Sequence, residues 1–414
     1  MLQMRKILII IILIICPQIA FAEDEYATQE ILNNPQEGEI SLFSEEATEI
    51  INDATDDIEE ELNIIHYLGK EPPKNTTEAP LIEKILKTNI TRTDVPGFLL
   101  KEELTHKYQK GILSETELYG GYRGSISGLF TPHNYSTTYD NNATEFGVYG
   151  KFKDPDYSFK LMFRPIPIHG KSYMDGLFGD IYLVNSKIPH HDIIAGFQRI
   201  QTGIEGGSGQ YTLPFYARSQ IARSFGNSRA LAAKIVGNYN YADYSLSFGS
   251  SGRYLVRGMP GSEFAGWLNI KPFGSSDGKL GKLTIGGGLT AGKHDINYTI
   301  GSAYIGYKHK KLWTNFEAAI ADGYNGSNGA SSNKASGFAY TIGWKIVPQL
   351  QIIGRIDQFN PNRDKHHDTK REYTAGINWF IKGQALRFIL NYVYCQNQNT
   401  HDSHKLIFAT QIMI

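Results

Sequence analysis

The last forty or so residues alternate between apolar and polar positions. From Tyr373 onward every second residue is apolar, in the run Tyr373, Ala375, Ile377, Trp379 and Ile381. The residues between them are mostly small or polar, and this period of two is typical of β-strands. The pattern resumes after a short turn, and a third strand, 405–414, ends the sequence. Pairing of that strand with the first strand would close a barrel and remove both sheet edges.

The same alternation recurs along residues 111–414 and predicts sixteen strands. The predicted strands are 116–130, 144–153, 157–164, 177–185, 191–200, 231–239, 242–250, 264–271, 282–291, 297–308, 312–321, 336–346, 349–357, 372–381, 384–394 and 404–414. An even number in this range is typical of bacterial outer-membrane proteins. We therefore predict an all-β fold, a transmembrane antiparallel β-barrel of about 16 strands.

The connections between these strands give a second indication. Outer-membrane barrels have short periplasmic turns and long outer loops, so connection lengths should alternate. Short turns such as 154–156, 240–241 and 347–349 are separated by longer polar connections, for example 322–335 and 358–371. Two connections break the rule, because 272–281 is long for an inner turn and 292–296 is short for an outer loop. Fourteen or eighteen strands therefore remain open alternatives.

The N-terminus predicts export. Arg5 and Lys6 precede an apolar run, 7–15, which is followed by Ala20-Phe21-Ala22. This order is that of a secretory signal peptide, residues 1–22, cleaved before Glu23. The apolar run is about half the length of a membrane anchor. A lipoprotein signal at Cys16 is the less favoured alternative, because Ile15 is not small. We predict that the protein lies in the outer membrane.

Residues 23–110 are predicted to be an acidic periplasmic leader. From Glu23 to His66 there are 15 Asp and Glu and no Lys or Arg, so residues 67–414 carry 39 basic against 27 acidic residues. Apolar residues at spacings of three and four predict an acidic amphipathic helix over 45–68, and a second short helix over 81–86. A coiled coil between subunits is one use of this helix, and a partly disordered leader or a helix packed under the barrel is the alternative that we favour.

Other chemistry has little support in the sequence. After cleavage only Cys395 remains, so no internal disulfide and no Cys-rich metal site is expected. The pairs His190-His191 and His366-His367 are adjacent in sequence, which is poor geometry for a shared metal. The glycine-rich stretch 203–209 lacks the Lys-Ser/Thr of a phosphate loop. We expect no catalysis, no cofactor, no metal and no nucleic-acid partner.

Basic residues dominate the face of the strands that we assign to the lumen. Taking the aromatic-rich face as the lipid side assigns Glu117, Glu145 and Asp357 to the lumen, and the long connection 201–230 adds Glu205. The candidate pore-lining and anion-binding residues are Arg123, Lys151, Lys160, Arg164, Arg199, Arg218, Arg223, Arg229, Lys345, Arg355 and Arg387. An excess of Arg and Lys in a narrow passage favours anions. The alternatives are pairing with acids across the lumen, or binding of lipopolysaccharide phosphates near the outer rim.

Several stretches between 180 and 414 resemble one family. The run 180–183, followed by Gly196-Phe197-Gln198-Arg199 and Gly203-Ile204-Glu205, is similar to the strand, turn and strand that precede the inward loop of the phosphate-selective porins O and P. The stretch 216–219 with Arg229 is similar to the loop itself, and 373–394 resembles the closing hairpin. Two positions depart from the family, Ala217 where Glu is usual and Ile414 where an aromatic residue is usual.

The resemblance implies a function and an assembly. In sixteen-stranded porins the third outer loop folds inward and narrows the pore, and 201–230 is the third outer connection here. We therefore expect a porin that gives passive diffusion of small anions such as phosphate, as a homotrimer surrounded by outer-membrane lipid and lipopolysaccharide. The alternatives are a non-selective diffusion porin, or a plugged barrel that acts as a surface structural or adhesive protein.

Overall fold

The computed structural model describes residues 99, 101–166, 172–275, 279–326, 329–398 and 400–414. The predicted signal peptide and the two predicted leader helices, 45–68 and 81–86, lie outside these residues. Within the described part of the chain, no helix is both long and apolar enough to cross a membrane.

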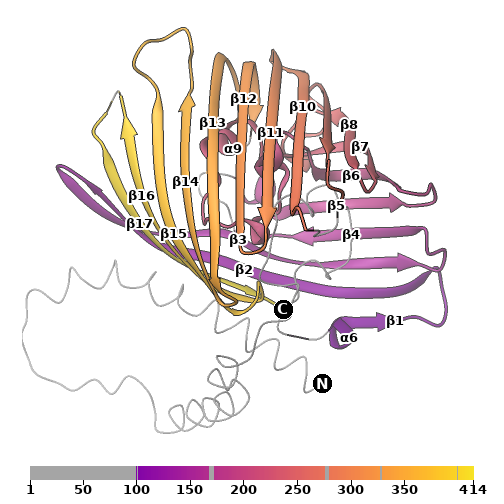
Figure 1. The fold of residues 1–414 in the computed structure, drawn as a ribbon. Coiled ribbons are helices and arrows are strands. Elements are labelled where there is room, and N and C mark those ends of the chain that lie inside the picture. Colours follow the sequence, from indigo (N-terminus) through magenta and orange to yellow (C-terminus); the bar gives the residue numbers. More distant parts are fainter. Residues whose placement is uncertain (1–98, 100, 167–171, 276–278, 327–328, 399) are drawn as a thin grey trace, which may run out of the picture. The chain divides into compact units, whose positions relative to one another are not determined.

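Strands make up most of the described chain (Figure 1). They are β1 (Thr105–Lys107), β2 (Leu113–Thr131), β3 (Asn134–Phe152), β4 (Tyr157–Phe163), β5 (Phe178–Asn185), β6 (His191–Arg199), β7 (Arg229–Asn238), β8 (Ala242–Ser250), β9 (Ser262–Ile270), β10 (Lys282–His294), β11 (Ile296–His309), β12 (Leu312–Gly326), β13 (Gly329–Val347), β14 (Leu350–Asn360), β15 (Lys370–Lys382), β16 (Leu386–Asn397) and β17 (Ser403–Met413). The helical segments are short: α6 (Lys101–Leu104), α7 (Tyr173–Leu177), α8 (Ile204–Gly207), η3 (Gln210–Thr212), α9 (Gln220–Phe225) and η4 (Leu255–Arg257).

Strands β2 to β17 form a closed antiparallel ring. Each strand pairs with its neighbours in sequence, and β17 returns to β2, with register from His404 opposite Phe130 to Met413 opposite Gly121. The predicted barrel of sixteen strands and its closure by the terminal strand are thus confirmed. The short strand β1, which pairs with β2, was not predicted.

The two faces of the ring differ in polarity as the alternation predicts. On β15, Ile377 and Trp379 are 41% and 44% exposed, whereas Asn378 between them is 0% exposed. Polar side chains therefore point into the ring and apolar ones point away from it. This arrangement suits a barrel whose outer surface contacts lipid.

Several predicted outer loops are strands instead. The predicted connections 131–143 and 322–335 are mostly extensions of β2, β3, β12 and β13. Strands β2 and β3 form a hairpin in which only residues 132 and 133 lie between the strands. Residues 134–141 are polar or aromatic without apolar alternation, so the pattern carries no strand signal there. Their backbone groups nevertheless pair across the hairpin. The predicted connection 292–296 is indeed short. Asp295 alone joins β10 to β11, with a φ of 52°.

Candidate functional site

The chain between β6 and β7, residues 200–228, lies inside the ring. We call it the inner loop; it contains α8, η3 and α9. The backbone N–H of Tyr216 donates to Asn391 Oδ1 on β16 at 2.9 Å, and its hydroxyl donates to the carbonyl of Asp140 on β3 at 2.9 Å. Helix α9 packs against β12, β13 and β14 (Figure 1). The loop therefore contacts walls far from its own strands, as the inward folding expected from the resemblance requires.

Two arginines from the wall hold the middle of the inner loop. Arg123 on β2 donates to the carbonyl oxygens of Gln210, Leu213 and Phe215, the last at 2.6 Å. Arg387 on β16 donates to the carbonyl of Leu213 at 2.9 Å and to Gln411 Oε1 at 2.8 Å. Both side chains are fully buried. A guanidinium has five N–H donors in a fixed geometry, so it can satisfy several carbonyls of a loop that lacks regular pairing.

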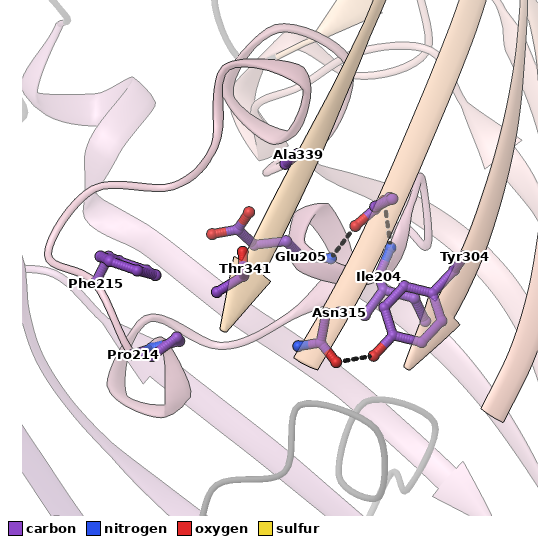
Figure 2. Close-up of a pocket in the computed structure, with 9 residues that line it drawn as sticks. Ile204, Glu205, Pro214, Phe215, Tyr304, Asn315, Ala339 and Thr341 are labelled. Atoms are coloured by element: carbon purple, nitrogen blue, oxygen red, sulfur yellow. Dashed lines mark hydrogen bonds between the residues drawn. The ribbon is translucent and has the colours of Figure 1, made fainter. Parts of the chain in front are cut away.

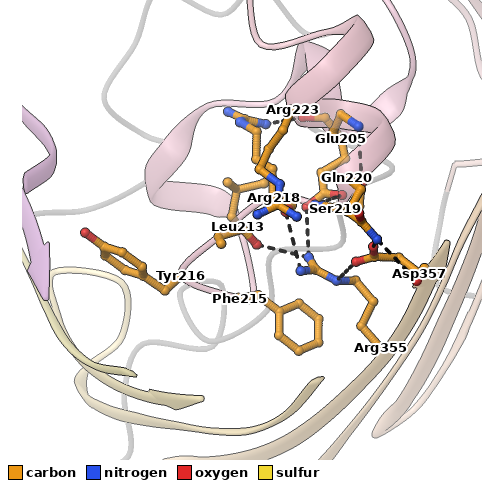
Figure 3. Close-up of polar contacts among 12 residues, drawn as sticks. Glu205, Leu213, Phe215, Tyr216, Arg218, Ser219, Gln220, Arg223, Arg355 and Asp357 are labelled. Atoms are coloured by element: carbon orange, nitrogen blue, oxygen red, sulfur yellow. Dashed lines mark hydrogen bonds and ion pairs between the residues drawn. The ribbon is translucent and has the colours of Figure 1, made fainter. Parts of the chain in front are cut away.

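Arg355 on β14 holds the next part of the loop (Figure 3). It donates to the carbonyls of Ala217 at 3.0 Å and Arg218 at 3.4 Å, and its guanidinium lies 4.7 Å from the centre of the Phe215 ring. Its Nε is 2.9 Å from Asp357 Oδ2. The charge of Arg355 is thus balanced by a carboxylate on its own strand, while its remaining donors fix the loop backbone.

Arg218 and Glu205 tie the two ends of the loop together. Arg218 donates to the carbonyls of Glu205 and Ser208, the latter at 2.6 Å, and Glu205 Oε2 accepts the backbone N–H of Ser219 at 3.1 Å. Burial lowers the pKa of Arg218 to about 9, against the opposing attraction of Glu205. The guanidinium stays charged at neutral pH because this pKa is still well above 7.

Glu317 on β12 explains the glycine-rich stretch at the start of the loop. Its carboxylate accepts the backbone N–H groups of Ile204 at 2.8 Å and Glu205 at 3.2 Å. Gly203 has a φ of 71°, and a Cβ there would lie 2.1 Å from Glu317 Oε1. Only glycine fits this backbone beside the carboxylate. The stretch therefore serves packing inside the barrel.

A cavity lies between the inner loop and β11, β12 and β13 (Figure 2). It is lined by Ile204, Glu205, Pro214, Phe215, Tyr304, Asn315, Glu317, Ala339 and Thr341. The Tyr304 hydroxyl donates to Asn315 Oδ1 at 2.8 Å. Its lining includes two carboxyl side chains, Glu205 from the loop and Glu317 from β12.

A cluster of basic side chains lies on the β4 to β7 wall at the base of the loop. Lys160 and Arg229 both bind Asp180, at 2.9 and 2.6 Å, and Arg164 lies 3.5 Å from Glu145. Arg199 is the direct cross-strand partner of Arg229 and donates to Asn227 Oδ1 at 2.8 Å. The charges of Arg229, Arg218 and Arg164 all act on Arg199. We call Lys160, Arg164, Arg199 and Arg229 the basic cluster.

The other candidate residues lie apart from this cluster. Arg223 on α9 donates through one guanidinium nitrogen to both carboxylate oxygens of Glu372 on β15, at 2.7 and 2.8 Å. Lys151 binds Glu115 at 2.7 Å, and Lys345 lies next to the turn between β13 and β14. The structure thus divides the eleven residues into three groups. Arg123, Arg218, Arg355 and Arg387 fix the backbone of the inner loop, Lys160, Arg164, Arg199 and Arg229 form the basic cluster, and Lys151, Arg223 and Lys345 lie elsewhere.

Several charged residues of the interior were not predicted from the sequence. Asp180, Glu317 and Glu372 contact basic residues or the loop but were not assigned to the lumen. Lys234 on β7, which donates to the carbonyl of Arg199 at 3.2 Å, was also missed. Strand alternation could have placed Asp180 and Lys234. No sequence signal shows that the Glu317 carboxylate would bind the start of α8.

Comparison with known proteins supports the fold. The family model of the phosphate-selective porins O and P matches residues 281–413, so the predicted resemblance is confirmed over that part of the chain. No curated protein matches the sequence.

Solved structures with a similar fold include a porin and another outer-membrane protein. An anion-selective porin from Comamonas acidovorans has a TM-score of 0.54 at 7% identity, covering 72% of this chain and 99% of that one. A loop L8 deletion mutant of OmpT, an outer-membrane protein of Vibrio cholerae, has a TM-score of 0.52 at 10% identity, with the same coverage of 72% and 99%. At these identities the likeness shows the fold alone.

Proposed function

We propose that this protein is an outer-membrane porin through which small anionic solutes, such as phosphate, diffuse passively. The sixteen-stranded ring with an apolar outer face suits a membrane barrel, and the inner loop suits a device that narrows its lumen. The family match over 281–413 supports the same assignment. Membrane lipid and lipopolysaccharide would surround such a barrel, and the resemblance favours a homotrimer.

The basic cluster is the observation that carries the anion preference. Lys160 and Arg229 share the carboxylate of Asp180, Arg164 pairs with Glu145, and the charges of Arg164 and Arg229 both act on Arg199. Four positive charges against two leave a net positive field along this wall. Field lines focus in a passage with low-dielectric walls, so the local concentration of anions rises. Solutes would be drawn to this wall and would pass beside the inner loop down their own gradient.

A non-selective porin is the second candidate. The ion pairs Arg223 with Glu372 and Arg355 with Asp357, together with the carboxylates of Glu205 and Glu317, offset much of the positive charge near the loop. If these acids dominate the passage, the pore would admit neutral and charged solutes alike.

Swelling of proteoliposomes tests whether the barrel conducts at all. The full chain is reconstituted and the vesicles are diluted into isosmotic arabinose, a neutral sugar small enough for a porin. We expect rapid swelling relative to vesicles without protein. Vesicles that hold the protein but do not swell would contradict the pore and favour a plugged barrel with a role at the cell surface.

A further inference from the structure

Tyrosines flank one lysine of the basic cluster on both sides. In the register of the sheet, Lys160 on β4 lies directly opposite Tyr149 on β3 and directly opposite Tyr182 on β5. Residues directly opposite on neighbouring strands point to the same face, so the three side chains form one row on the inner wall. We call it the tyrosine–lysine row.

A fourth side chain completes an aromatic surface beside this row. Tyr119 on β2 stacks on Tyr149, with ring centroids 4.3 Å apart and an interplanar angle of 28°. The Lys160 ammonium lies 5.3 Å from the centre of the Tyr149 ring and 5.5 Å from that of Tyr119. The ammonium therefore lies beside both rings. Tyr119 covers one face of Tyr149, and Tyr149 and Tyr182 pack against a buried cluster that includes Val184 and Trp267, but both remain partly exposed.

The row carries charges of both signs, with the positive charge concentrated around Lys160. The buried side chain of Glu117 on β2 lies directly opposite Tyr149, at the other end of the row. The Asp180 carboxylate is shared between Lys160 at 2.9 Å and Arg229 at 2.6 Å, and Arg164 lies 3.5 Å from Glu145. An ammonium has three N–H donors, so Lys160 can bind Asp180 and still donate to a second anion. The Tyr119 hydroxyl, on a side chain that is 8% exposed, has no hydrogen-bond partner among the described residues.

Tyrosine hydroxyls can donate to an inorganic anion, but the ring faces add nothing to its recognition. Phosphate and chloride are bound by N–H and O–H donors that surround them, and the faces of aromatic rings offer none. A ring face instead packs against a flat apolar group, and offset stacking stabilises such a pair beyond the area that it buries. A wall that presents ring faces beside an ammonium thus matches a solute with a flat apolar body and an anionic end.

We infer that the tyrosine–lysine row is a binding site for organic anions of this kind, with small aromatic carboxylates as the class that fits best. The carboxylate binds the Lys160 ammonium, and the ring of the solute stacks on Tyr149 or Tyr182. The inference rests on the proposed pore function and specifies which anions the pore retains during passage.

Block of chloride current in a planar bilayer tests this assignment. Benzoate is added to the full-length protein in KCl, and acetate, which has the same carboxylate without the ring, is the matched control. We expect benzoate to reduce the current at a concentration about tenfold lower than acetate, because ring stacking adds that much affinity. Equal potency of benzoate and acetate would overturn the assignment, and this comparison needs no variant.

Paired variants locate the site. Replacing both Tyr149 and Tyr182 by Leu keeps apolar side chains but removes the rings, and replacing both by Phe keeps the rings. We expect the Leu variant to lose the tenfold preference for benzoate and the Phe variant to keep it. Loss in both variants, or in neither, would contradict stacking on these rings. Chloride selectivity measured in the same bilayers separates the two proposals: an anion-selective pore without benzoate preference contradicts only the site, and a pore without anion preference contradicts the proposed function.

Discussion

Arg123 and Arg387, on β2 and β16, donate to the same backbone oxygen, the carbonyl of Leu213, at 3.5 and 2.9 Å. Strand β17 lies between their two strands, so the two arginines bind the inner loop from separate strands of the barrel. With Arg355 on β14, three arginines bind the loop between residues 210 and 218 through its carbonyls. These arginines thus fix the position of the loop inside the barrel.

Removal of one anchor should loosen the loop. Arg387→Met keeps a long apolar side chain but leaves the Leu213 carbonyl with Arg123 alone, and loss of a charged donor to a buried acceptor costs about 1–3 kcal/mol. We expect larger current noise and more variable single-channel conductance in a bilayer. Arg371→Met is the matched control, because among the described residues the Arg371 side chain donates to Gln358 Oε1 on β14. Unchanged current noise and conductance in the Arg387 variant would show that this arginine does not restrain the loop.

Gly203, the residue just before α8, should not tolerate replacement by a residue with a side chain. Gly203→Ala combines a left-handed φ of 71° with a Cβ 2.1 Å from Glu317 Oε1, so the carboxylate or the helix must move. We expect a lower yield of refolded protein and a changed conductance. Gly209→Ala is the control within the same loop, since nothing lies within 4 Å of its added Cβ and its φ is −70°. Equal behaviour of the two alanine variants would contradict the close fit at Gly203.

Removal of a positive and of a negative charge near the basic cluster should shift the anion preference of the pore in opposite directions. Arg164→Gln removes a positive charge and Glu145→Gln removes its negative partner, 3.5 Å away. We expect the first to lower and the second to raise the permeability ratio of chloride over potassium, by a few fold at low salt, because the effect is electrostatic. The ratio is measured from zero-current potentials at 0.1 M and 1 M salt, where screening should shrink both shifts. Shifts of the same sign in the permeability ratio, or no shifts, would show that this wall does not line the passage.

Cys395 provides a natural probe of the interior. It is half-buried on β16, directly opposite Glu372, whose partner is Arg223 on the inner loop. We expect an anionic methanethiosulfonate to react with the thiol several-fold faster than a cationic one of similar size, because anions concentrate in a positive field. Arg223→Gln should reduce the ratio of the two rates. Mass spectrometry of the modified protein gives both rates, and faster reaction of the cationic reagent would contradict a positive interior.

The homotrimer stays a prediction from the family resemblance. Light scattering of the protein in detergent measures the mass of the protein part of the complex. We expect three copies of the mature chain. A mass of one copy would contradict the trimer without bearing on the pore.

The strands could be predicted from the sequence because the two faces of the ring differ in polarity. Residues such as Ile377 and Trp379 point outward while Asn378 points into the interior, as expected for a barrel in a membrane. The signal stops where the contrast stops. Residues 134–140 are exposed polar or aromatic residues, so the outer part of β3 was predicted to be a loop.

The interior was predictable only in part. Alternation assigned Arg123, Arg355 and Arg387 to the inner face, but their backbone partners on the loop depend on how residues 210–218 cross the barrel. The row of Tyr149, Lys160 and Tyr182 depends on strand register, which the spacing of apolar residues does not determine across three strands. Side chains that meet through a folded loop or through register leave no mark in a single sequence.

The most direct test of the anion pore is the zero-current potential of the refolded full-length protein in a planar bilayer across a tenfold gradient of KCl. We expect a potential of the sign that chloride permeation produces, and a decrease of its magnitude when Arg164 is replaced by Gln. A potential near zero, or one of the sign that potassium permeation produces, would contradict anion selectivity.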